Sequence, residues 1–166
     1  MPKRSNQSLG NSLMAEPWRL AVVIPTRDRL TKLGECLDAL SKQKSQSFTV
    51  FVIASGTDAE DVISKYKQCL DITYLFTEQR GQITQRNIGI KLALDSGVDY
   101  VGFLDDDVIM EADGFNEIER FITDSRDQGE TDFGLGFNII SEESDSVYGW
   151  KAWIKQFLGV VGSRPG

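Results

Sequence analysis

From Arg19 onward, short apolar runs alternate with amphipathic helical patterns, and this alternation is what most limits the fold. The expected strands are apolar runs bounded by turn residues, at 20–24, 48–54, 72–76 and 98–104. The helices expected between them repeat apolar residues every three or four positions, within 30–40, 57–70 and 81–97. Repeated strand–helix units favour parallel strands joined by right-handed crossovers. We therefore predict an α/β fold with a mostly parallel sheet and helices on both faces.

Local patterns add detail to these helices. Thr57-x-x-Glu60 has the spacing of a capping box at the start of the second helix. Glycine at position 97 should end the third helix, since glycine readily adopts the left-handed backbone that follows a helix. The apolar residues expected on the inward face of the third helix are Ile83, Ile88, Leu92 and Ala93. The two cysteines, Cys36 and Cys69, occupy apolar positions of expected helices, which predicts free thiols packed in the core.

Charge and composition exclude several classes of protein. The chain has 25 Asp and Glu against 18 Lys and Arg, a net charge of -7, which argues against a nucleic-acid partner. It contains no histidine, so carboxylates must carry any proton transfer and the common zinc sites are excluded. No apolar run approaches the roughly 20 residues of a membrane span, which predicts a cytoplasmic protein. We expect residues 1–17 to be a flexible leader and residues 18–166 to form one domain.

Polar residues gather where the expected strands end. In parallel sheets the carboxyl ends of the strands share one edge, where ligands bind. The first strand leads into Pro25-Thr26-Arg27-Asp28, the second into Ser55, the third into Arg80-Gly81 and the fourth into Asp105-Asp106-Asp107. The sequence therefore predicts one ligand site built from these four loops.

Three consecutive aspartates are costly at the end of a buried strand unless a cation offsets their repulsion. In an extended chain Asp105 and Asp107 would project to one side and Asp106 to the other. Hard carboxylate oxygens suit Mn²⁺ or Mg²⁺, so we predict a metal site at Asp105 and Asp107. The alternative is a solvated acidic turn without a ligand.

Three motifs, taken in order, resemble the nucleotide-sugar half of family 2 glycosyltransferases, which have the Rossmann-like GT-A fold. They are Val23-Ile24-Pro25-Thr26-Arg27, then Arg80-Gly81-Gln82 with Gln85-Arg86-Asn87-Ile88-Gly89-Ile90, then Phe103-Leu104-Asp105-Asp106-Asp107. The resemblance implies a DXD motif whose metal bridges the diphosphate of the donor, and transfer of the sugar with inversion. The residues it places at the nucleotide-sugar are Pro25, Thr26, Arg27, Asp28, Ser55, Arg80, Gly81, Arg86, Asn87, Asp105 and Asp106.

Two positions depart from the family pattern. Ala54 and Ser55 stand where the family commonly has an aspartate that binds the nucleotide base, so a UDP-sugar is favoured by family habit alone. The catalytic base of the family lies far beyond the metal motif, and this sequence has 59 residues after Asp107. We expect a base beyond Gly166 and a chain truncated before the acceptor half, because Glu142 and Glu143 resemble a solvated loop.

These patterns leave the function open in part. The favoured hypothesis is an enzyme that transfers sugar to a glycan or lipid-linked acceptor in cell-surface polysaccharide synthesis. The alternative is a non-catalytic nucleotide- or metal-binding module, or an inactive fragment. A phosphoryl-transfer enzyme is disfavoured, since no Gly-x-x-x-x-Gly-Lys loop is present.

An aromatic stripe marks the expected C-terminal helix. Trp150, Trp153 and Phe157 alternate with Lys151 and Lys155, which predicts an amphipathic helix. Its apolar face could pack on this domain's own sheet, on a missing domain, on a second subunit or peripherally on the inner face of a membrane.

Overall fold

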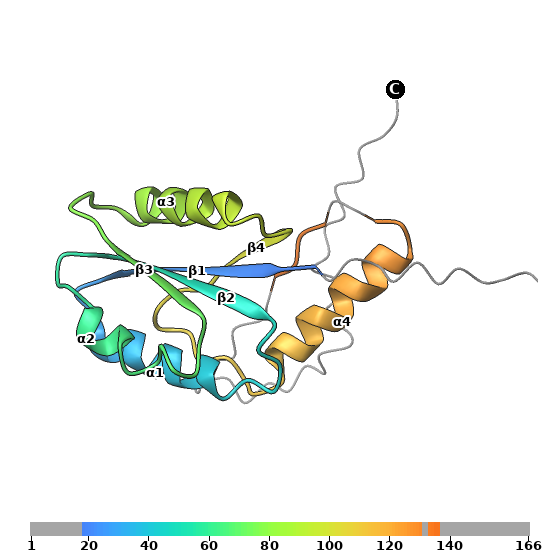
Figure 1. Cartoon of the computed structure of the whole chain (residues 1–166), viewed down its shortest axis with the longest axis horizontal. Coiled ribbons are helices and arrows are strands. Elements are labelled where there is room, and N and C mark those ends of the chain that lie inside the picture. The colour runs from blue at the N-terminus through green and yellow to red at the C-terminus, as the bar shows by residue number, and fades with distance from the viewer. Residues whose placement is uncertain (1–17, 131–132, 137–166) are drawn as a thin grey trace, which may run out of the picture. The chain divides into compact units, whose positions relative to one another are not determined.

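The computed structural model describes residues 18–130 and 133–136 and contains a parallel sheet in the order β3-β2-β1-β4 (Figure 1). The strands are β1 (Leu20–Arg27), β2 (Phe48–Ser55), β3 (Ile72–Phe76) and β4 (Tyr100–Phe103). The helices are α1 (Leu30–Ser41), α2 (Glu60–Ile63), α3 (Gln82–Asp95) and α4 (Gly114–Asp127). Helix α3 covers one face of the sheet, and α1 and α2 lie on the other (Figure 1). The predicted α/β class, strand order along the chain and two-sided helical cover are confirmed.

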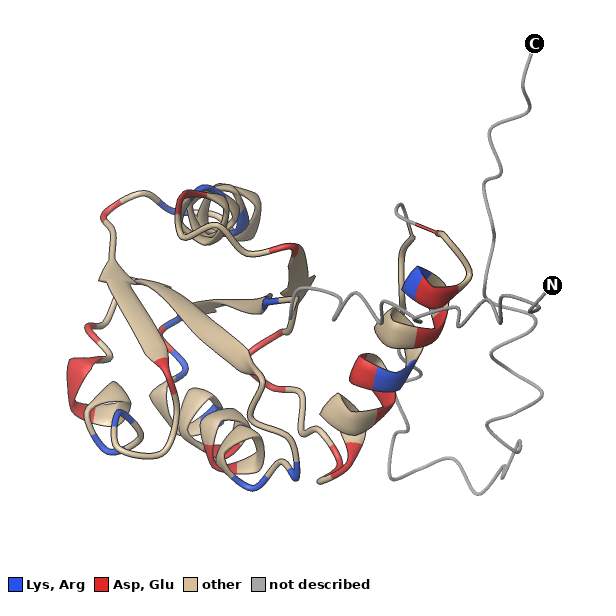
Figure 2. Ribbon diagram, turned by 45° about the vertical axis from the view of Figure 1, so that its right-hand side comes forward, with Lys and Arg blue, Asp and Glu red and all other residues tan. Residues whose placement is uncertain are grey.

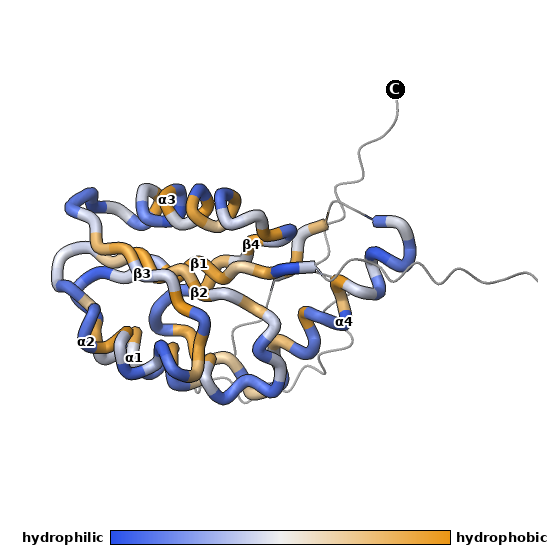
Figure 3. Tube along the Cα trace, viewed as in Figure 1, coloured by the Kyte–Doolittle hydropathy of each residue, from blue (hydrophilic) through white to orange (hydrophobic). Residues whose placement is uncertain are grey.

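The central strands form the core because they are apolar on both faces. Both β1 and β2 are buried almost throughout, as expected for strands covered by helices on two sides. Between α3 and the sheet lies a hydrophobic cluster in which Ala93 of α3 packs with Ala21, Val23, Phe51 and Ile53 of β1 and β2. Figure 3 shows hydrophobic colour concentrated along the strands, and in Figure 2 the charged residues lie in the helices and loops.

Helix α3 meets the sheet along a different face from the one predicted. Its buried residues are Gln85, Gly89 and Ala93, four residues apart, and partly buried Ile88 and Leu92 flank this stripe. The prediction for Ile83 was wrong, because that side chain is 75% exposed. Residues two apart on a helix are rotated by about 200°, so a sheet that contacts position 85 leaves position 83 facing outward.

Two further local predictions were wrong. Helix α2 starts after Ala59, not at Thr57, and it has no side-chain cap. The Thr57 hydroxyl donates instead to Asp28, 2.9 Å away, so a contact between two loops replaces the capping box. Cys36 is buried as predicted, whereas Cys69 is exposed. The predicted end of α3 is confirmed, since Gly97 has φ of 76° just past the helix.

By its contacts, the chain divides into two units, residues 1–117 and 118–166, and all predicted ligand residues fall in the first. No helix in the described part of the chain has the length and apolarity needed to cross a membrane. The aromatic stripe at Trp150, Trp153 and Phe157, and the acids Glu142 and Glu143, lie outside the described residues.

Candidate functional site

The site lies at the carboxyl edge of the sheet, where β1 extends past β4. The last residue of β4, Phe103, pairs with Val23, so the four residues from Ile24 to Arg27 continue beyond the end of β4. The space beside this extension is a cavity of about 270 Å³ next to the first turn of α3. Its lining residues are Pro25, Thr26, Arg27, Arg29, Gly81, Gln82 and Gln85.

The aspartates occupy a turn and not an extended chain. Strand β4 ends at Phe103, and the amide of Val108 donates to the carbonyl of Asp105 at 3.1 Å. The alternation of faces expected for a strand therefore does not apply to these residues. Asp105 has its partners in α3, whereas Asp106 and Asp107 share Arg29.

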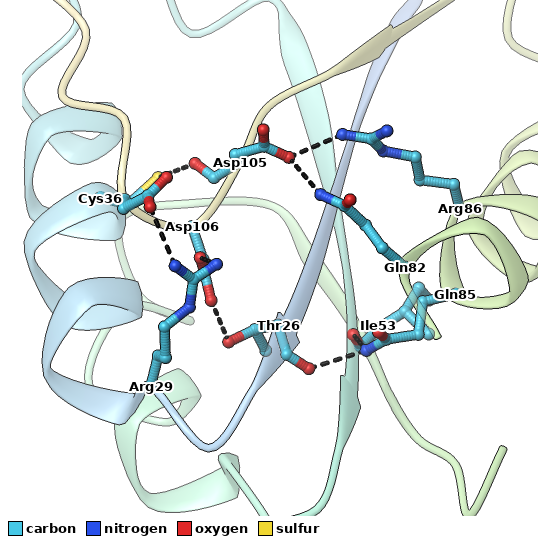
Figure 4. A network of polar contacts seen from close by, with 10 residues as sticks. Thr26, Arg29, Cys36, Ile53, Gln82, Gln85, Arg86, Asp105 and Asp106 are labelled. Carbon is cyan, nitrogen blue, oxygen red and sulfur yellow. Dashed lines mark hydrogen bonds and ion pairs between the residues drawn. The ribbon is translucent and has the colours of Figure 1, made fainter. Parts of the chain in front are cut away.

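Asp106 is the buried member of the trio, with no exposed surface. Its Oδ2 accepts a hydrogen bond from the Thr26 hydroxyl at 2.6 Å, and its Oδ1 lies 2.5 Å from a guanidinium nitrogen of Arg29 (Figure 4). A buried carboxylate is tolerated when it is paired and hydrogen-bonded in this way. Asp106 is fully buried in this structure, so its predicted contact with the nucleotide-sugar stays a prediction.

Asp105 faces α3, as Figure 4 shows. Its Oδ1 accepts from the Gln82 amide at 2.9 Å and from Arg86 at 2.7 Å. The Arg86 guanidinium carbon also lies 5.8 Å from the centre of the Phe103 ring, within cation–π range. Arg86 is therefore held between Asp105 and the ring of Phe103 at the end of β4.

Asp107 is paired with the segment before α1. Its Oδ2 lies 2.9 Å from a second guanidinium nitrogen of Arg29, so this one arginine contacts two of the three aspartates. The side chains of Asp105 and Asp107 are 42% and 47% exposed. Both carboxylates are thus open to solvent as well as paired with an arginine.

A second cluster ties together the loops after β1 and β2. Asp28 has a left-handed backbone, φ 56°, and its Oδ1 accepts from the Thr57 amide at 2.8 Å and from the Thr57 hydroxyl. These hydrogen bonds, together with the nearby Arg27 guanidinium, lower the pKa of Asp28. A Cβ at Gly56, φ 79°, would lie 2.3 Å from Asp28 Oδ1, so the contact requires glycine there.

Gln85 and Arg29 are site residues that the sequence analysis missed. The buried Gln85 amide donates to the carbonyls of Thr26 and Ile53, both at 2.7 Å, and so joins the ends of β1 and β2 to α3. Gln85 begins one of the motifs quoted above, which was the available signal, but no role was assigned to it. Arg29 follows directly on the Pro25–Asp28 motif, and that adjacency was the available signal.

The other predicted residues are distributed around this network. Pro25, Arg27 and Gly81 line the cavity. Ser55 is fully buried, and its hydroxyl lacks a hydrogen-bond partner among the described residues. Arg80 and Asn87 are exposed. The structure therefore brings Thr26, Arg86 and the three aspartates together and leaves Arg80 and Asn87 at the surface.

The donor set is suited to a hard divalent cation that also binds a ligand. The described residues contain no group of three or more His, Cys, Asp or Glu side chains arranged to hold a metal. The contacts of Asp105 use only Oδ1 and those of Asp107 use only Oδ2, which leaves one oxygen on each. Mg²⁺ in proteins is commonly held by one or two carboxylates together with substrate phosphates. Two exposed carboxylates beside a cavity fit that pattern.

Comparison with known proteins agrees with this geometry. The family model described as glycosyl transferase family 2 matches residues 21–147. An uncharacterized glycosyltransferase of Rickettsia bellii is 28% identical over 111 residues, and one of Rickettsia felis is 28% identical over 97 residues. These matches cover 64% and 57% of this chain but 16% of each relative, so the chain spans a small part of their length.

A structural comparison finds the same fold in a solved protein. The crystal structure of Staphylococcus aureus TarS superposes with a TM-score of 0.59 at 24% identity, over 65% of this chain and 20% of that one. Residues 1–349 of TarS have been solved with UDP, with a TM-score of 0.59, and with UDP-GlcNAc, with a TM-score of 0.57. At this identity the likeness concerns the fold.

Proposed function

This chain belongs to glycosyl transferase family 2, and from that membership we propose that it binds a nucleotide-diphosphate sugar in the cavity beside the end of β1. In the proposed reaction the sugar passes to an acceptor hydroxyl, with inversion and with Mn²⁺ or Mg²⁺ as cofactor. The observation that carries the proposal is the pair of exposed carboxylates, Asp105 and Asp107, whose partners Gln82 and Arg29 line that cavity.

Charge at the site supports an anionic ligand in a chain that is acidic overall. Arg27 and Arg29 line the cavity although the net charge of the chain is -7. Guanidinium groups match the planar geometry of phosphate oxygens and remain charged at any physiological pH. A diphosphate would therefore find two guanidinium groups at the cavity, Arg27 beside Asp28 and Arg29 beside Asp106 and Asp107.

Each part of the site has a role in this proposal. Asp105 and Asp107 would hold the metal, which supplies a Lewis acid that neutralises charge on the departing diphosphate. Arg27 and Arg86 would bind phosphate oxygens, and Asp28 with the loop after β2 would border the nucleoside. The solved TarS complexes with UDP and UDP-GlcNAc favour uridine as the base. The acceptor proposed is a glycan or a lipid-linked sugar, and no general base is assigned to the described residues.

Coupled binding of metal and nucleotide tests the proposal. Calorimetric titration of Mn²⁺ with and without UDP should show much tighter Mn²⁺ binding in the presence of UDP, since both ligands share the metal. Asp107→Ala should abolish that coupling while the protein stays folded, because removing a carboxylate relieves repulsion. The matched control, Asp61→Ala, removes an exposed acid in α2 and should retain it. Independent binding of the two ligands by the unmodified protein would reject the proposal and favour a simple acidic turn.

A further inference from the structure

We propose that Arg29 acts as an internal counter-cation of the proposed metal site. Arg29 pairs with Asp107 when no diphosphate is bound, and this pairing makes metal binding depend on the nucleotide. This inference rests on the proposed function, because it concerns the same site. Nothing in the motifs that define the family resemblance assigns a role to this residue.

The Arg29 guanidinium contacts two carboxylates. One nitrogen lies 2.5 Å from Asp106 Oδ1 and another lies 2.9 Å from Asp107 Oδ2. The planar fork of an arginine can hold two carboxylates at once, which a lysine ammonium cannot do with the same geometry. The positive charge of Arg29 is therefore shared between Asp106 and Asp107.

Asp106 and Asp107 differ in how deeply their carboxylates are buried. Asp106 is fully buried and is also held by Thr26, so leaving it without Arg29 would strand a buried charge. Asp107 is 47% exposed and can exchange partners with solvent or a cation. If Asp107 held a metal, Arg29 would therefore release Asp107 and stay attached to Asp106.

The guanidinium nitrogen that Asp107 would release could bind an anion in the cavity. Arg29 lines the cavity together with Arg27, Gly81 and Gln82. A metal alone at Asp107 would face the repulsion of a nearby guanidinium, as well as that of Arg86 at Asp105. A diphosphate in the cavity offers oxygens to that guanidinium and to the metal, so each ligand favours the other.

The competing explanation is that Arg29 only neutralises buried Asp106. In that case removing the arginine would lower stability without strengthening metal binding. The two explanations therefore predict opposite outcomes for Mn²⁺ measured alone, which makes binding without nucleotide the decisive measurement.

The experiment follows free Mn²⁺ by electron paramagnetic resonance in the unmodified protein, Arg29→Met and Lys32→Met, each with and without UDP. Arg29→Met should bind Mn²⁺ alone roughly tenfold more tightly, because a unit charge at contact distance from the ligand carboxylate is removed. The ratio by which UDP strengthens Mn²⁺ binding should fall correspondingly. Lys32 is a charge-matched control in α1, since it lies close enough to Asp107 to interact electrostatically but pairs with Glu35. Its substitution should change Mn²⁺ affinity by less than about twofold.

Circular dichroism tests whether each variant folds. If Arg29→Met does not fold, Arg29→Lys replaces it in the experiment. A lysine keeps the charge beside Asp106 but not the fork, so Mn²⁺ alone should bind severalfold more tightly than in the unmodified protein. Unchanged or weaker Mn²⁺ binding in the folded Arg29 variant overturns the inference, as does an equal gain in Lys32→Met. Absence of coupling in the unmodified protein would instead reject the proposed function, so the two failures are distinguishable.

Discussion

Among the residues that the structure describes, Asp106 is the one charged residue that is fully buried. Two side chains contact its carboxylate, the Thr26 hydroxyl from β1 and the Arg29 guanidinium from the segment before α1. The buried aspartate thereby links β1, the start of α1 and the turn after β4. Asp105 and Asp107, its neighbours in the chain, keep 42% and 47% of their side chains exposed, and these are the two carboxylates that our proposal assigns to the metal.

Thr26→Val tests the importance of this link. Valine has nearly the same shape but no hydroxyl, so it leaves Asp106 Oδ2 without its donor at 2.6 Å. Hydrogen bonds to charged groups contribute about 1.5–3 kcal/mol, and we expect the free energy of unfolding to fall by about 2 kcal/mol. Urea denaturation measures the change. Thr73→Val on β3, where the side chain is exposed, should stay within about 0.5 kcal/mol of the unmodified protein; equal effects of the two substitutions would contradict the assignment.

Helix α3 packs closely on the sheet at Gly89, where the contact stripe has no side chain. Gly89 lies over Val23 and Ile53, and a Cβ there would come within 2.2 Å of a Val23 methyl carbon. One turn earlier, the Gln85 amide reaches the carbonyls of Thr26 and Ile53. The close approach and the buried amide depend on each other, since a larger residue at position 89 would lift the helix away from the strand ends.

Gly89→Ala should therefore destabilise the protein although alanine is the better helix former. The added methyl overpacks the α3 interface, which typically costs about 1–3 kcal/mol. Gly34→Ala in α1 is the matched control, since its added Cβ would meet Val62 at an ordinary 3.8 Å. That control should be neutral or stabilising by up to about 1 kcal/mol. Thermal unfolding of both variants gives the comparison, and a stable Gly89→Ala protein would show that α3 sits farther from the sheet.

The strand order explains why the site forms where it does. The chain runs outward from β1 through β2 to β3 and then returns to place β4 on the other side of β1. In open parallel sheets, ligands bind where the direction of strand addition reverses, because the loops on either side diverge there. The turn of aspartates, the Pro25–Asp28 loop and the first turn of α3 all border that reversal between β1 and β4.

Thiol reactivity reports whether this junction is closed in solution. Cys36 is buried beneath the aspartate turn, and its thiol donates to the Asp105 carbonyl at 3.9 Å. Burial, with the Asp106 and Asp107 carboxylates, raises the pKa of Cys36 to about 12, so at pH 8 it remains protonated and unreactive. Cys69 is exposed. We expect a thiol reagent to modify one cysteine rapidly and the other at least about 10³-fold more slowly, limited by unfolding.

Two controls assign the phases of that reaction. Cys69→Ser should remove the rapid phase, and both thiols should react rapidly in concentrated urea. Two rapid thiols in the native protein would mean that the turn of aspartates opens readily over α1.

Repeated local patterns account for the part of the structure that was predictable. Strand and helix order, the α/β class and the gathering of polar residues at strand ends follow from periodicity and from the rule that parallel strands share a carboxyl edge. The partners of individual side chains were not predictable. Thr26 meets Asp106 across 80 positions, and Gln85 meets Thr26 across 59. Residues so far apart in the sequence come into contact only because the crossovers set the register of strands and helices. Local pattern therefore predicted that aspartates and arginines would meet, whereas packing selected Asp106 for burial, Ile83 for exposure and Arg29 as the shared cation.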